Sequence, residues 1–131
     1  MLLRRAAVRG GGRAAAALRA ECYCRPCQHM SGGAPNLFML MPSEGFSWTH
    51  GEPKRFSRPD LENAVTREFC GDCGTQIATR RPGLDAVVLK IGTLDDPTAF
   101  GGAALAIFTT EKQPFHEIAE GVRAFEGMPG R

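Results

Sequence analysis

Two short cysteine-rich stretches decide the fold of this chain: CYCRPC at residues 22–27, the first cluster, and CGDCG at residues 70–74, the second cluster. Together they contain all five cysteines of the 131-residue sequence. A disulfide inside either stretch would close a very small loop, and an odd number of cysteines cannot pair completely. Thiolates two or three residues apart can instead converge on one tetrahedral ion. The spacing therefore indicates zinc ligands, and the alternative is a set of reduced or redox-active cysteines without metal.

The composition is that of one domain with a core of ordinary size, because 43% of the residues are hydrophobic and 23% are charged. Five of the 16 basic residues lie in the first 20 positions, which contain no acidic residue, so the rest of the chain is mildly acidic. This distribution argues against a nucleic-acid partner, which needs a basic face on the folded domain. No apolar run approaches the roughly 18 residues of a membrane span, so we expect no membrane partner.

The first 20 residues are rich in arginine, alanine and glycine, as a mitochondrial presequence is. However, Gly10, Gly11 and Gly12 would break a helix, serine is absent, and cleavage would leave almost no chain ahead of Cys22. We therefore expect residues 1–20 to be a degenerate opening strand or a misassigned start. Residues 21–131 are expected to form a zinc-binding domain, with a cytoplasmic rather than a mitochondrial location.

Short apolar runs separated by Gly- and Pro-containing turns recur about every ten residues, which predicts a mainly β, mostly antiparallel domain. The predicted strands are residues 36–41, 46–49, 54–57, 65–69, 76–79, 86–91 and 104–109. Helix is predicted only as short pieces at residues 61–64 and in a turn at residues 27–30. Four aromatic residues at strand positions are expected in the core: Phe46, Trp48, Phe56 and Phe69. The pair Asp95 and Asp96, which precedes Pro97, is expected to serve a turn.

The two clusters differ in what they can do chemically. In the second cluster, Gly71 and Gly74 allow the chain to wrap sharply, so Cys70 and Cys73 can face one ion. A lone Cys-x-x-Cys fits a zinc knuckle or a redox pair, and the flanking strands favour the knuckle. The first cluster offers three sulfurs and leaves one tetrahedral position open, as in catalytic zinc sites. A fourth ligand from elsewhere in the chain would instead fill the open position and make the site structural. The spacing is compatible with a catalytic and with a structural site.

Several motifs occur together in an order that resembles the glutathione-dependent formaldehyde-activating enzyme family, which also includes centromere protein V. They are ECYCRPCQHMSGG (21–33), GEPKRF (51–56), FCGDCGT (69–75) and GTLDDP (92–97), and the resemblance runs from about residue 21 to residue 125. It implies a β-tent fold of short antiparallel strands with one catalytic and one structural zinc site. Carried over by position, Cys22, Cys24 and Cys27 match the catalytic ligands, and Cys70 and Cys73 match half of the structural site.

The other half of the structural site is missing from the sequence. Family members normally open with a Cys-x-Cys-Gly segment, and here Leu3 and Arg5 stand where its cysteines belong. Three explanations are open: the structural site is lost, the start of the translated sequence is not the native one, or the second cluster recruits another ligand. His29, His50 and a sulfur of the first cluster are the candidates for that ligand.

The resemblance implies reversible addition of the glutathione thiol to formaldehyde, the reaction of a carbon–sulfur lyase. A zinc ion with an open position can bind the thiol, lower its pKa and hold it for attack on the aldehyde carbon. Arg25 lies inside the ligand loop, the segment of residues 22–27 that carries the three cysteines of the first cluster. It can hold a glutathione carboxylate or offset the charge of the thiolates. The alternative is that Arg25 is only a solvated loop residue. We expect Zn²⁺ as cofactor and, as partners, glutathione or another small thiol and a small aldehyde. The alternative is a non-catalytic zinc-binding or interaction module on the same fold.

Overall fold

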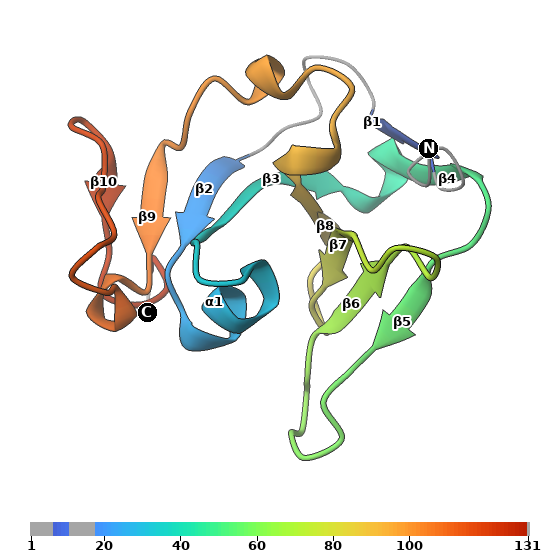
Figure 1. The fold of residues 1–131 in the computed structure, drawn as a ribbon, viewed down its shortest axis with the longest axis horizontal. Coiled ribbons are helices and arrows are strands. Elements are labelled where there is room, and N and C mark those ends of the chain that lie inside the picture. The colour runs from blue at the N-terminus through green and yellow to red at the C-terminus, as the bar shows by residue number, and fades with distance from the viewer. Residues whose placement is uncertain (1–6, 11–17, 131) are drawn as a thin grey trace.

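A single eight-stranded sheet is the central element of the fold (Figure 1). The computed structural model describes residues 7–10 and 18–130. The strands follow one another across the sheet in the order β10-β9-β2-β3-β8-β7-β6-β5, and β1 pairs with β4 in a separate two-stranded sheet. The prediction of a mainly β fold is confirmed. The strands are β1 Ala7–Gly10, β2 Leu18–Cys22, β3 Asn36–Pro42, β4 Phe46–His50, β5 Lys54–Phe56, β6 Thr66–Phe69, β7 Gln76–Arg80, β8 Ala86–Lys90, β9 Leu105–Ile107 and β10 Arg123–Ala124.

All seven strands predicted from the sequence are present, as β3 to β9. The last of them ends early, at Ile107, because Phe108 adopts a left-handed backbone (φ 54°) that leads into the 3-10 turn Thr109–Glu111. The prediction of helix at residues 61–64 is wrong, since that segment forms turns. β2 crosses residue 20, the expected boundary of the zinc-binding domain.

Neighbouring strands are antiparallel from β2 to β5, as expected for a chain whose strands are joined by short turns. The other end of the sheet departs from this pattern. There β9 lies parallel to β2, and β10 lies parallel to β9. As a result, the segment after residue 104 lies beside the first cluster. There the backbone N–H of Tyr23 donates to Ile107 O at 3.0 Å.

The turn predicted at residues 27–30 belongs to the helix α1 Arg25–Ser31. Pro26 lies in its first turn, where a missing N–H costs no helical hydrogen bond. The helix ends at Gly32, whose φ of 82° is a left-handed conformation that glycine adopts without steric cost. α1 packs against β3 and lies between β2 and β6 in Figure 1. No helix within residues 7–10 and 18–130 is long and apolar enough to cross a bilayer.

The core consists of two groups of buried side chains. The first gathers around Met41, Phe46, Cys70, Ile77, Ala78, Val87 and Leu89, and the second around Ala20, Cys22, Cys27, Phe38 and Ile107. Each cysteine cluster thus contributes to one group. Of the aromatic residues expected in the core, Phe46 is buried, Trp48 packs against the first group and Phe69 is half-buried. Phe56 is 51% exposed, which corrects the prediction, because β5 is an edge strand with all three residues exposed.

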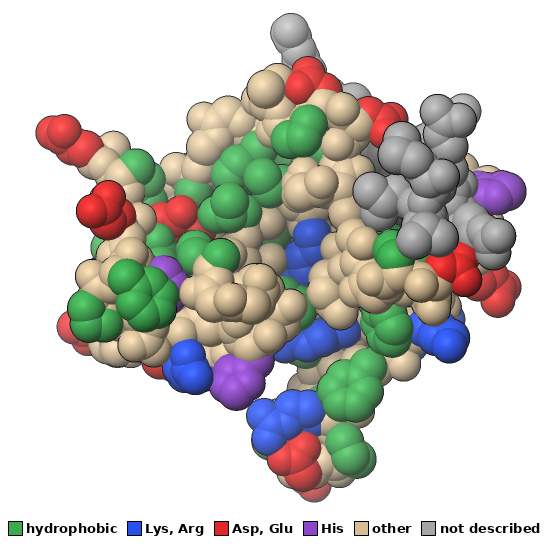
Figure 2. All heavy atoms as spheres, in the orientation of Figure 1, with side chains coloured by type: hydrophobic (Ala, Val, Ile, Leu, Met, Phe, Trp, Pro, Cys, Tyr) green, Lys and Arg blue, Asp and Glu red, His purple; other side chains and the backbone are tan. Residues whose placement is uncertain are grey.

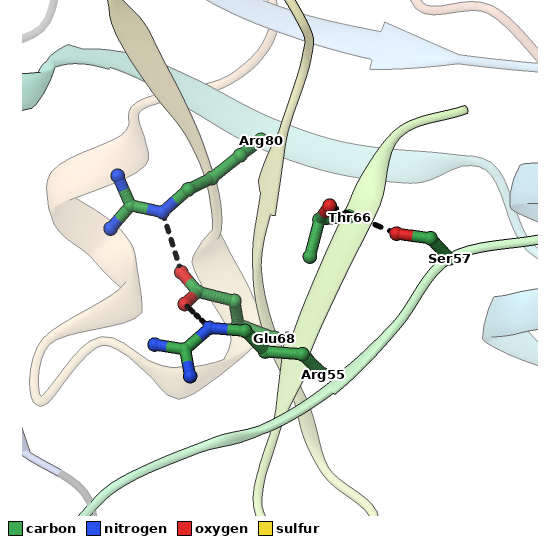
Figure 3. A network of polar contacts seen from close by, with 5 residues as sticks. All are labelled: Arg55, Ser57, Thr66, Glu68 and Arg80. Carbon is green, nitrogen blue, oxygen red and sulfur yellow. Dashed lines mark hydrogen bonds and ion pairs between the residues drawn. The ribbon is translucent and has the colours of Figure 1, made fainter. Parts of the chain in front are cut away.

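A buried carboxylate ties together the three strands at the β5 end of the sheet (Figure 3). Glu68 on β6 is only 1% exposed and accepts hydrogen bonds from Arg55 Nε on β5 at 3.0 Å and from Arg80 Nε on β7 at 2.8 Å. Elsewhere, the Asp96 carboxylate accepts the Thr98 backbone N–H at 3.1 Å and caps the 3-10 turn Pro97–Phe100, which confirms its turn role.

Candidate metal centre

The three cysteines of the first cluster come together at the junction of β2 and α1. Cys22 ends β2, Cys24 precedes α1 in an extended conformation (φ −60°, ψ 150°), and Cys27 lies in the first turn of the helix. Their sulfur atoms lie within 4.8 Å of one another. Zinc–thiolate bonds of about 2.3 Å in a tetrahedron place neighbouring sulfurs about 3.8 Å apart, so the three side chains fit a zinc ion with small adjustments. These cysteines could therefore hold a metal ion, as the sequence predicted.

The thiols of the first cluster hydrogen-bond to one another, and this moves the pKa values of Cys22 and Cys24 in opposite directions. Cys22 and Cys27 are buried, whereas Cys24 is half-buried. Hydrogen bonds from Cys22 and Cys27 hold the pKa of Cys24 below its ordinary value, and the positive charge of Arg67 acts in the same direction. Hydrogen bonds to Cys24 and Cys27, with burial, raise the pKa of Cys22.

The ligand loop is held in place by the segment that follows β9. Gln28, which is 2% exposed, donates through Nε2 to Tyr23 O at 2.6 Å and to Glu111 O at 2.9 Å. The backbone N–H of Arg25 donates to Glu111 Oε1 at 3.0 Å. His116 Nε2 lies 2.6 Å from Gly33 O, just beyond α1. Sequence reasoning missed these supporting residues, because the contacts with Glu111 and the contact of His116 with Gly33 each join positions more than 80 residues apart, and no local spacing reveals them.

Arg25 lies at the surface beside the cluster. Its Nη1 donates to Gln28 Oε1 at 2.5 Å, and its Nη2 lies 3.3 Å from His29 Nε2. These contacts keep the guanidinium over α1 while the side chain as a whole stays exposed. A guanidinium has five N–H donors, so donors remain for an external acceptor.

Two further cations lie near the sulfurs, and sequence reasoning missed both. Lys90 at the end of β8 is only 7% exposed, and burial lowers its pKa to about 8 against the opposing charges of the cluster thiols. Arg67 on β6 is half-buried and places Nη1 2.9 Å from Met30 Sδ on α1. The charge of Arg67 also acts on Lys90 and on Cys24. Alternation along a strand shows which residues of that strand share a face. It shows that Arg67 and Lys90 share a face only when the order and register of the strands between them are known.

The second cluster forms the tight turn between β6 and β7. The Gly74 N–H donates to Cys70 O at 2.8 Å and the Cys70 N–H to Thr75 O at 2.9 Å, with Gly74 at a φ of 75°. Cys70 is buried, Cys73 is exposed, and the sulfur of Cys73 lies 3.1 Å from the hydroxyl oxygen of Thr75. Hydrogen bonds from the Thr75 hydroxyl and backbone N–H lower the pKa of the Cys73 thiol.

The second cluster offers only two ligand side chains. No histidine, acidic residue or further cysteine completes a group of three with them in the described part of the chain, so the structure does not bring His29, His50 or the first cluster to it. Leu3 and Arg5, which stand in place of the expected cysteines, lie outside the described residues. Residues 1–17 contain no cysteine, histidine, aspartate or glutamate.

A protein-family profile matches the part of the chain that contains both clusters. The profile of the family described as glutathione-dependent formaldehyde-activating enzyme matches residues 7–111, well over half of the chain. No curated protein matches the sequence significantly.

Proposed function

Because the chain belongs to the glutathione-dependent formaldehyde-activating enzyme family, we propose that it is a zinc-dependent carbon–sulfur lyase. In its reaction glutathione or another small thiol adds to formaldehyde or a related small aldehyde. The observation that carries this proposal is the convergence of three sulfurs on one point, which leaves one tetrahedral position for a substrate thiol. A cytoplasmic location is part of the proposal, supported by five free cysteines of the kind that reducing compartments preserve.

The chemistry needs a thiolate held next to an aldehyde. When bound, zinc supplies a position at which a thiol loses its proton near neutral pH. The thiol sulfur then bonds to the carbonyl carbon, and the carbonyl oxygen takes up a proton equivalent to the one that the thiol lost. Cys22, Cys24 and Cys27 would hold the ion, and their three negative charges favour a nucleophilic sulfur over strong polarisation of the carbonyl. Arg25 would bind a carboxylate of the thiol substrate through its remaining donors.

The second candidate is a zinc-binding or interaction module without catalysis. The second cluster favours it, because it offers only two ligand side chains among the described residues and forms no group of three. Thiols also add to unhindered aldehydes unaided, so only a rate above the uncatalysed background supports the lyase.

The test compares Cys24→Ser with Cys73→Ser, because each removes one thiol and only Cys24 belongs to the group of three. The measurements are bound zinc, thermal stability and the rate of hydroxymethylglutathione formation above background. We expect Cys24→Ser to lose zinc and the rate enhancement and to retain the fold, and Cys73→Ser to retain both zinc and rate. A Cys24→Ser protein with the wild-type rate would overturn the proposal that the first cluster is the active site of a lyase. A wild-type protein that binds zinc and gives no rate above background would favour the module.

A further inference from the structure

The register of the sheet places Lys90 on the same face as the first cluster. Side chains of directly paired residues point to the same face of a sheet, and residues two apart on one strand also share a face. Phe38 on β3 pairs with Ala20 on β2 and with Lys90 on β8. Cys22 lies two residues after Ala20, so Cys22 and Lys90 lie on one face, two strands apart.

Arg67 lies on this face as well. It pairs with Thr79 on β7, and Thr79 pairs with Val88, which lies two residues before Lys90 on β8. Glu68, the acidic neighbour of Arg67 in the sequence, points to the opposite face, where Arg55 and Arg80 bind it (Figure 3). The sheet therefore keeps the nearest buried acid away from Arg67.

The two cations have no carboxylate partner in the described part of the chain. The charged groups that act on Lys90 are Cys27, Cys22, Cys24 and Arg67. Next to Arg67, the buried hydroxyl of Thr79 makes no hydrogen bond with any residue that the structure describes. Figure 2 shows Lys and Arg side chains inside a hollow between α1 and the strand β6. A buried ammonium is costly unless a negative charge compensates it, and the sulfurs of the first cluster are the groups whose negative charge opposes the cost of burying Lys90.

The charges predict which fourth ligand the cluster accepts. A divalent ion with three thiolates carries one net negative charge, which disfavours a fourth anion at the open position. Lys90 and Arg67 add two positive charges, so the site as a whole becomes neutral only when a further negative charge enters. We propose that Lys90 and Arg67 are the specificity-determining residues that make the first cluster bind a small thiol as its thiolate in preference to a neutral ligand. This inference rests on the proposed function and names the protein groups that select its thiol substrate.

The test uses protein loaded with Co²⁺ in place of zinc, because sulfur-to-cobalt absorption bands report each bound thiolate directly. Glutathione and 2-mercaptoethanol are titrated as thiols, and imidazole is titrated as a neutral ligand for the same position. Cobalt affinity is measured separately by competition with a chelator. The variants are Lys90→Met, Lys90→Arg and Arg67→Met, and the control is Lys54→Met on the exposed edge strand β5.

We expect Lys90→Met to raise the Kd for both thiols about tenfold or more, since one unit charge is removed beside the bound anion in a partly buried site. Imidazole affinity should not fall, Lys90→Arg should restore thiol binding, and Arg67→Met should weaken thiol binding in the same selective way. Lys54→Met should behave as the wild type.

Wild-type thiol affinity in both Lys90→Met and Arg67→Met would overturn the inference. An equal loss of thiol and imidazole affinity would also overturn it, because such a loss indicates that the substituted residue has a structural role. If Lys90→Met does not fold, Arg67→Met decides the question by the same criteria. Failure of the proposed function looks different: thiol binding that depends on Lys90 without any rate above background would refute the lyase and leave this inference standing. Catalysis above background, with a thiol affinity that is unchanged in the Lys90 and Arg67 variants, would support the lyase and overturn this inference.

Discussion

At the scale of single residues, the environment of each thiol differs more than the sequence suggests. Cys70 and Cys73 are three positions apart, yet Cys70 is 3% exposed and Cys73 lies at the surface. Only Cys73 has a hydroxyl beside its sulfur, that of Thr75 at 3.1 Å. A hydrogen bond to sulfur stabilises the thiolate, so the two thiols of one Cys-x-x-Cys motif are chemically distinct.

This difference predicts an effect of Thr75→Val on the reactivity of Cys73. The substitution removes the largest cause of the lowered pKa of Cys73, so that pKa should rise towards its ordinary value. In metal-free protein, alkylation of Cys73 by iodoacetamide should then slow at neutral pH, where less thiolate is present, and match the wild type at strongly alkaline pH. Peptide mass spectrometry measures the rate at this site across the pH range. Thr110→Val, at an exposed threonine, is the control, and equal rates at neutral pH would show that the hydroxyl has no such role.

At the scale of elements, polar contacts join segments at both ends of the sheet. Gln28 and Glu111 attach α1 to the segment after β9. At the other end, Glu68 joins β5, β6 and β7 through two arginines that are themselves 57% and 41% exposed. Because the arginines stay hydrated, the buried carboxylate gains charge-assisted hydrogen bonds without burying two further charges.

Glu68→Gln should therefore destabilise the β5–β6–β7 end of the sheet. The amide keeps the shape of the side chain but loses the charge and one acceptor oxygen, which corresponds to about 2 kcal/mol of unfolding free energy. Urea denaturation followed by circular dichroism measures the loss. The control is Arg58→Gln, which breaks the exposed Arg58–Asp60 pair and should leave the urea midpoint unchanged. Similar midpoints for both variants would contradict the role of Glu68.

At the scale of the whole molecule, the number of ligands limits the metal content. The first cluster gathers three sulfurs, and the second offers two with no third ligand side chain among the described residues. The segment of residues 1–17 contains no side chain of the usual ligand types, so it cannot complete the second cluster.

We therefore expect one zinc ion per chain to survive dialysis against a mild chelator, and a second to be held weakly or not at all. Metal analysis of protein purified without added zinc gives the ratio. Cys22→Ser should lower it to near zero, whereas Cys70→Ser should leave it at one. Two equivalents retained by the wild type would show that the ligand count is wrong and that another group completes the second cluster.

Much of the fold and the ligand set could be predicted because their signals are local. The three sulfurs of the first cluster lie within six residues, and β3 to β9 are short apolar runs bounded by turn residues. Phe56 shows the limit of such reasoning, since an aromatic residue at a strand position is buried only if the strand is not at the edge of the sheet. The segment of residues 61–64, which begins at Leu61, shows a second limit. The sequence pattern predicts helix there, but four residues are too few to stabilise a helix.

The sequence by itself determined that Cys22, Cys24 and Cys27 can bind a metal ion and where β3 to β9 lie, since both depend on spacings of two to four residues. Only the tertiary structure decided that β9 runs parallel to β2, that Gln28 on α1 bonds to Glu111, and that Lys90 and Arg67 lie on the same face of the sheet as Cys22. These contacts join residues far apart in the chain, and they depend on strand order and register. A slip of one residue in the pairing of β8 would turn Lys90 to the opposite face and remove it from the site.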